Sequence, residues 1–82
     1  MKIDLAKVEK DFRASLNNED NYKPRVSKLA FLQVMHSSYL REHDKFINKE
    51  IDLSMKEGLE LCCKLIVVSQ MVSDEIENPT EK

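Results

Sequence analysis

The sequence contains little glycine, proline or cysteine and no tryptophan: one Gly, two Pro and two Cys among 82 residues. A single glycine cannot build a phosphate-cradling loop, and catalytic signatures such as G-x-S-x-G and H-E-x-x-H do not occur. Cys62 and Cys63 are adjacent, so they cannot supply the spaced disulfides of a small secreted domain. These absences argue against an enzyme and favour a reducing compartment.

Long apolar runs and a strong charge of one sign are also missing. The most apolar stretch, residues 61–68, is shorter than the roughly 20 residues that cross a bilayer, and the charged first residues do not resemble a secretory signal. Net charge is −2, and basic residues such as Arg41 and Lys45 alternate with Glu42 and Asp44. Nucleic-acid binding normally needs a dense basic stripe. We therefore expect a cytoplasmic protein with no membrane and no nucleic-acid partner.

The scarcity of glycine and proline, with few β-branched residues outside 66–68, predicts an all-α chain. A first helix is expected over residues 4–18, where four apolar residues recur at helical spacing and predict one buried stripe. These four residues are Leu5, Val8, Phe12 and Leu16. Glu9 and Arg13, four residues apart, are placed to form an ion pair on this helix. The Asn- and Asp-rich segment 17–21 should end it.

The second and third helices are expected over residues 24–48 and 54–77. Pro24 suits the first turn of the second helix, and Ser27 is the competing cap. Ser54 and Glu57 fit the capping box of the third helix, which should stop before Asn78 and Pro79. The short connector predicts an antiparallel hairpin. Residues 1–78 thus form one expected domain, and residues 79–82 form a tail.

The third helix is apolar around most of its circumference, since Lys64 is the one Lys or Arg between Leu61 and Val72. A surface helix normally shows a single apolar stripe, and a chain of this length hides only about 60% of its unfolded surface. We therefore expect self-association through the second and third helices, as a two-fold dimer or a higher oligomer.

Apolar candidates for the interface lie on both helices. They are Phe31, Met35, Tyr39, Leu59, Cys62, Ile66, Val67 and Met71. Glutamate at Ile66 or Val67 should abolish partner binding and leave helicity largely intact. His36, His43 and Lys64 are candidate polar contacts.

Two chemical alternatives involve the same polar residues. His36 and His43, seven residues apart on one helix face, could ligate zinc with Cys62 or Cys63, and a cysteine with His43 could form a nucleophile and base. The spacing matches no recognised metal signature, and the thiols lie among Leu, Ile and Val, where cysteines are usually inert. We expect no catalytic residue, no metal and no cofactor.

The sequence thus predicts a non-enzymatic protein–protein interaction module, such as an adaptor, a chaperone-like protein or an inhibitor, that acts through an apolar helical surface. Its expected partners are itself and another protein. The alternative is a small oligomeric ligand-binding or sensing protein with a pocket at the subunit interface. A transcriptional regulator would need a basic recognition helix, which the sequence lacks.

Far-ultraviolet circular dichroism tests the expected fold class. The spectrum should be dominated by helix because the whole chain apart from two connectors and its ends has a helical pattern. Substantial strand signal, or helicity below about half where globular proteins average about one-third, would contradict it.

Overall fold

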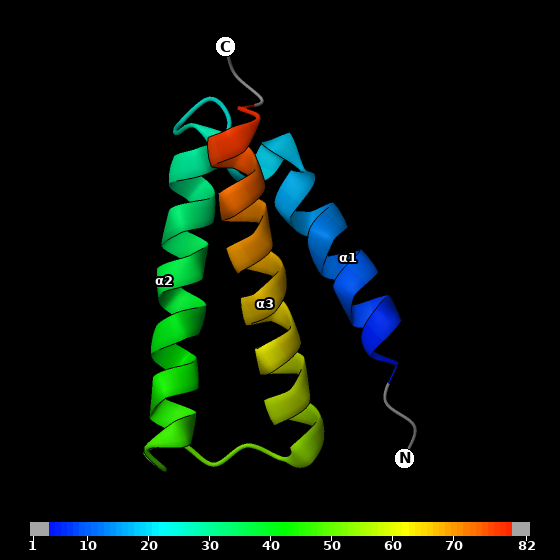
Figure 1. Ribbon diagram of the computed structural model, residues 1–82, viewed down its shortest axis with the longest axis vertical. Coiled ribbons are helices and arrows are strands. Elements are labelled where there is room, and N and C mark those ends of the chain that lie inside the picture. The colour runs from blue at the N-terminus through cyan, green and yellow to red at the C-terminus, as the bar shows by residue number, and fades with distance from the viewer. Residues whose placement is uncertain (1–3, 80–82) are drawn as a thin grey trace.

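The computed structural model describes residues 4–79, which form three α-helices, one short 3-10 helix and no strand. In chain order the elements are α1 (Leu5–Asn17), η1 (Glu19–Asn21), α2 (Lys28–Ile47) and α3 (Met55–Glu77). The expected three-helix, all-α architecture is confirmed, and α2 and α3 run antiparallel side by side (Figure 1). No helix in this described part is long and apolar enough to span a membrane. The last three residues of the expected tail, 80–82, lie outside the described range.

Local capping sets the start of α3. The Ser54 side chain accepts a hydrogen bond from the Glu57 backbone N–H at 3.1 Å, and the Glu57 carboxylate accepts one from the Ser54 N–H at 3.3 Å. This is the capping box that the sequence predicted. Asp4 caps α1 in a similar way, because its carboxylate accepts from the Lys7 N–H at 3.1 Å.

The expected start of α2 near Pro24 was wrong. The helix begins at Lys28, and the competing cap Ser27 accepts from the Ala30 N–H at 3.1 Å. The preceding segment instead turns to bury Tyr22, whose ring stacks on Phe31 with centroids 5.5 Å apart. Burial of a large aromatic side chain outweighs the preference of proline for a first helical turn.

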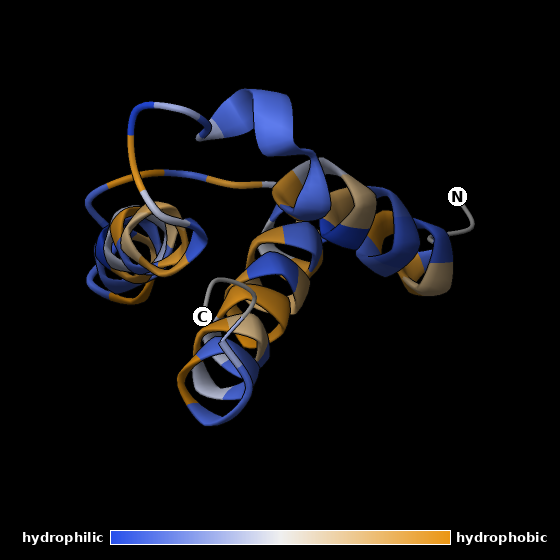
Figure 2. Ribbon diagram, turned by 90° about the horizontal axis from the view of Figure 1, so that it is seen from above, coloured by the Kyte–Doolittle hydropathy of each residue, from blue (hydrophilic) through white to orange (hydrophobic). Residues whose placement is uncertain are grey.

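α3 is the central helix and packs against both α1 and α2 (Figures 1 and 2). Six apolar residues from the three helices form the core cluster. They are Phe12, Leu16, Leu32, Val67, Val68 and Met71. The Phe12 ring meets Tyr39 of α2 edge-to-face at 5.3 Å between centroids, and the Lys64 ammonium of α3 lies 5.7 Å from the Phe12 centroid. One aromatic side chain of α1 thus contacts both helices of the hairpin.

α1 covers the hairpin less completely than its apolar stripe predicted. Phe12 and Leu16 are buried, Val8 is half-buried and Leu5 is exposed. The amino-terminal end of α1 diverges from α3 in Figure 1. Both buried anchors lie in the carboxy-terminal half of the helix, so only that half is held against the core, and the expected burial of Leu5 is not found.

The sole glycine allows close packing where α2 ends and α3 begins. Gly58 is buried, and a Cβ atom there would lie 3.1 Å from Cζ of the Phe46 ring. Glycine normally destabilises a helix relative to alanine. Here the missing side chain provides the space into which Phe46 packs.

Leu32→Ala should lower the free energy of unfolding by about 2–5 kcal/mol, because Leu32 is fully buried in the core and its truncation leaves a cavity. Leu40→Ala on the same helix is the matched control. Leu40 is 42% exposed, so its truncation should cost less than about 1 kcal/mol. Urea denaturation followed by circular dichroism measures both, and equal losses would contradict the assigned core.

Candidate functional site

One face of α3 carries an exposed stripe of apolar and small side chains, here called the α3 outer stripe. Its members alternate in steps of four and three residues. They are Met55, Leu59, Cys62, Ile66, Ser69, Ser73 and Ile76. Such spacing keeps the side chains on one side of a helix and is the pattern of a coiled-coil seam.

The outer stripe is open to solvent in the single chain. Ile66 is 61% exposed, Met55, Leu59 and Ile76 are also exposed, and Cys62 is half-buried. α1 and α2 pack against other sides of α3, and in the view along the long axis α3 extends below both in the picture (Figure 2). The structure therefore leaves one full side of its central helix without a covering element among residues 4–79.

A groove of about 380 Å³ separates α1 from α3 beside the outer stripe. Leu5 and Glu9 line it from α1, and Leu59, Cys62 and Ile66 are among its α3 residues. Its apolar walls continue the surface of the stripe toward α1.

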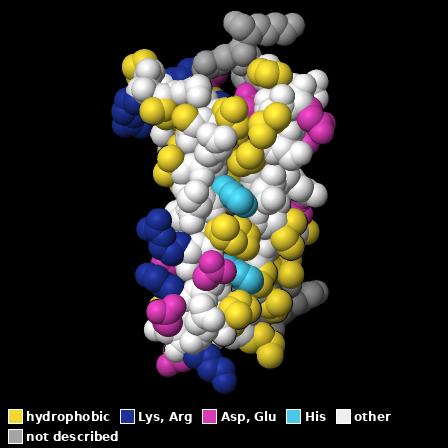
Figure 3. Space-filling model, turned by 60° about the vertical axis from the view of Figure 1, so that its left-hand side comes forward, with side chains coloured by type: hydrophobic (Ala, Val, Ile, Leu, Met, Phe, Trp, Pro, Cys, Tyr) yellow, Lys and Arg dark blue, Asp and Glu magenta, His cyan; other side chains and the backbone are white. Residues whose placement is uncertain are grey.

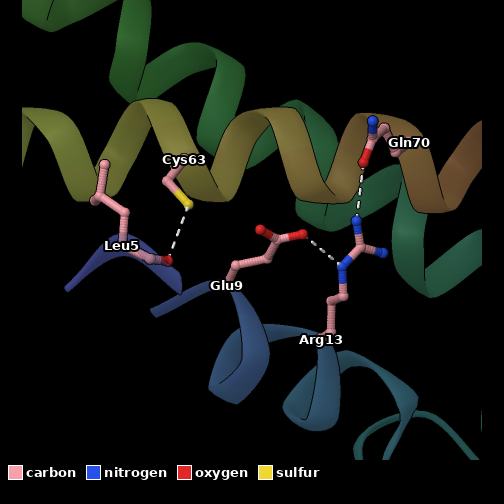
Figure 4. Close-up of polar contacts among 5 residues, drawn as sticks. All are labelled: Leu5, Glu9, Arg13, Cys63 and Gln70. Carbon is pink, nitrogen blue, oxygen red and sulfur yellow. Dashed lines mark hydrogen bonds and ion pairs between the residues drawn. The ribbon is translucent and has the colours of Figure 1, made fainter. Parts of the chain in front are cut away.

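Polar contacts join α1 to α3 along this groove (Figure 4). Arg13 donates from Nη2 to the Gln70 Oε1 atom at 2.8 Å, and from Nε to the Glu9 carboxylate at 3.1 Å. The Glu9–Arg13 ion pair expected from the sequence is thus confirmed. The Cys63 thiol approaches the Leu5 carbonyl oxygen at 4.0 Å, a weak contact. The Arg13–Gln70 and Cys63–Leu5 contacts thus join α1 to α3 beside the groove.

The environment of Cys63 disfavours nucleophilic chemistry. Burial raises the pKa of the Cys63 thiol and the nearby Glu9 carboxylate raises it further, while Lys64 and Arg13 act in the opposite direction. A raised pKa keeps the group as a thiol at neutral pH, whereas the thiolate is the nucleophile and the metal ligand. The geometry around Cys63 suits a packing role.

The structure divides the predicted interface residues into two groups. Leu59, Cys62 and Ile66 lie on the outer stripe. Val67 and Met71 belong to the core of the single chain, so their burial needs no partner. Glutamate at Val67 would place a charge in the core, so Ile66 is the position of the two that tests the surface without disturbing the fold.

The three interface residues predicted on α2 also pack against the core. Phe31, Met35 and Tyr39 are half-buried and pack against the core cluster. Burial raises the pKa of the Tyr39 hydroxyl, in keeping with its position against the Phe12 ring. These side chains contribute first to packing within the single chain.

The candidate polar contacts are placed on different helices. The two histidines are half-buried on α2, and Figure 3 shows both side chains beside hydrophobic ones on one face of the molecule. Lys64 instead points toward Phe12 of α1. Across residues 4–79, no group of three or more His, Cys, Asp or Glu side chains is arranged to hold a metal ion. Within the described residues, the two histidines and the cysteines are therefore not brought together as a zinc-ligand cluster.

The predicted interface residues do not include either end of the stripe, Met55 and Ile76, or the serines between Ile66 and Ile76. The signal that identifies them is the regular alternation of four- and three-residue steps along α3. The sequence also does not reveal the burial of Glu75, which is 8% exposed in a helix whose other acidic residues are less covered. Every buried side-chain N or O atom in residues 4–79 has a hydrogen-bond partner, so this burial leaves no carboxylate oxygen unsatisfied.

Comparisons of the chain with protein-family models, curated proteins and solved structures find no match.

Alkylation of a Cys62→Ser variant, in which Cys63 is the remaining cysteine, tests the environment of the Cys63 thiol. Its alkylation by iodoacetamide should be slower at neutral pH than that of an unstructured cysteine peptide, and its rate should rise to a plateau at higher pH, because the Cys63 pKa is raised. A pH–rate profile measured by mass spectrometry reports the midpoint. A midpoint below that of the peptide would contradict the described environment.

Proposed function

We propose that this protein is a non-enzymatic protein–protein interaction module that acts through the α3 outer stripe. The observation that carries the proposal is the run of exposed apolar residues at coiled-coil spacing on the central helix. Scattered exposed apolar residues are ordinary on a protein surface, whereas an aligned set marks an interaction site. The proposal includes self-association and a cytoplasmic location.

The largest side chains of the stripe offer the most apolar surface to a partner. Full burial of a Leu, Ile or Met side chain contributes roughly 1.5–3 kcal/mol relative to exposure. Leu59, Ile66 and Ile76 retain much of that surface in the single chain. A partner that covers these side chains together gains several kcal/mol toward the entropic cost of association.

The shape of the surface favours a helical partner. A straight stripe on one helix presents knobs and holes at the spacing that a second helix can match. Recognition of an amphipathic helix by its apolar residues at steps of three and four is a recurring mode of protein binding. We therefore propose that the partner binds the α3 outer stripe through an amphipathic helix.

A small ligand in the α1–α3 groove is the second candidate. The groove volume of about 380 Å³ falls within the range of ligand pockets, and Glu9 supplies a charged group among apolar walls. Native mass spectrometry of the purified protein separates the two candidates, because a bound ligand adds a discrete mass to the chain.

Ile66→Glu should remove partner binding while leaving helicity and thermal stability close to wild type, because Ile66 is exposed and outside the core. Val34→Glu is the matched control. Val34 is 68% exposed and lies on α2 beside Ala30, Ser37 and Arg41, away from the stripe. Quantitative affinity capture with wild-type and both variant proteins measures the effect.

The expected result is at least a tenfold loss of captured partner for Ile66→Glu, the equivalent of about 1.4 kcal/mol, with no loss for Val34→Glu. Equal capture by all three proteins would assign binding to another surface. Circular dichroism of each variant confirms that the loss does not come from unfolding.

A further inference from the structure

We infer that the helix that covers the α3 outer stripe is α3 of a second copy of this chain, running antiparallel about a two-fold axis. The inference rests on the proposed function, in which the stripe is an interaction surface, and it names the partner and the register. The order of side-chain sizes along the stripe and the charges that flank it favour this arrangement.

The stripe is asymmetric in side-chain size. In heptad terms Leu59, Ile66 and Ser73 occupy the a positions, and the remaining members occupy the d positions. Large side chains fill the amino-terminal half of the stripe, and both serines lie in the carboxy-terminal half. A second stripe fits this surface best when its small half meets the large half.

An antiparallel two-fold arrangement provides that fit. Ile66 then packs against Ser69 of the partner subunit, and Cys62 packs against Ser73 of the partner subunit. Leu59 at one end meets Ile76 of the partner subunit, and the axis repeats each contact. Every layer thus contains at least one side chain larger than serine. A parallel pair would instead place Ser69 and Ser73 each against its own copy, which brings hydroxyl groups together and buries little apolar surface.

The flanking charges select the same orientation. Lys56 and Glu77 are exposed and occupy the e positions at opposite ends of α3. In an antiparallel pair the e positions of the two helices face each other, so Lys56 lies opposite Glu77 of the partner subunit, and this contact occurs twice. In a parallel pair the e positions face g positions, which are Gly58, Leu65 and Val72 and carry no charge.

The rest of the fold leaves room for this pairing. α1 and α2 pack on other sides of α3, which extends below them in Figure 2. The contact is a single pair of helices, so its area is at the low end for protein interfaces, and we expect a dimer in the micromolar range. The uncovered side of the central helix is thereby covered by an identical helix.

Disulfide mapping tests the register with the native Cys62 as a probe. In a Cys63→Ser background, Ser73→Cys places a second thiol opposite Cys62 of the partner subunit, and diamide should convert the protein into a covalent dimer visible on a non-reducing gel. The matched controls carry one cysteine each: Cys63→Ser alone retains Cys62, and Ser73→Cys with Cys62→Ser and Cys63→Ser retains only the new thiol.

Neither control should form a disulfide-linked dimer. In the antiparallel register, equivalent cysteines of the two subunits are separated by eleven residues, about 16 Å along the helix axis. A disulfide needs its Cα atoms within about 7 Å. Efficient cross-linking of Cys63→Ser alone would show a parallel pair and overturn the inference. Failure of all three proteins to cross-link, with a wild-type monomer in sedimentation up to millimolar concentration, would overturn it as well.

Reversing the charges of Lys56 and Glu77 provides a second test of the antiparallel pair. Lys56→Glu or Glu77→Lys should each weaken dimerisation about three- to tenfold in sedimentation equilibrium, and the double exchange should restore it. Lys10→Glu, which changes an exposed charge on α1, is the control and should have no effect.

The two proposals can fail separately. A monomeric wild-type protein whose partner capture is still lost in Ile66→Glu would overturn the homodimer and support the interaction module. An Ile66→Glu protein that captures its partner and dimerises like wild type would overturn both.

Discussion

The contact of the Phe12 ring with both helices of the hairpin is the interaction on which the arrangement of α1 depends. The ring meets Tyr39 of α2 edge-to-face, and the Lys64 ammonium of α3 lies over it, so one side chain connects all three helices. Aromatic side chains contribute large buried areas with directional contacts, which suits a domain whose core is small. Because this anchor lies in the carboxy-terminal half of α1, that half packs closely and the other half diverges.

The position of α1 decides which surface of α3 remains open. α3 receives α2 on one side and α1 on another, and its third side carries the outer stripe. Covering that side as well would require a fourth helix, which the described chain does not provide. The exposed apolar residues of this side are thus a consequence of a three-helix fold built around a helix that is apolar nearly all round.

The polar groups near this surface make contacts within the chain. The Cys63 thiol is held near the Leu5 carbonyl with a raised pKa, and Lys64 is directed to an aromatic ring. Arg13 is committed to Glu9 and Gln70 at the edge of the groove. Cys63, Lys64 and Arg13 thus each make a contact that connects α1 to α3.

The sequence by itself determined the features that depend on neighbouring residues: the all-α fold, the Ser54 capping box and the hairpin with its short connector. It did not determine that α2 starts at Lys28, because that depends on the burial of Tyr22 against Phe31 from another part of the chain. Ile66 and Val67 show the same limit for the candidate site. Both are apolar, β-branched and adjacent, yet Ile66 is exposed and Val67 is buried. Only the directions from which α1 and α2 approach α3 distinguish them, since consecutive helical residues point about 100° apart and tertiary packing decides which direction is covered.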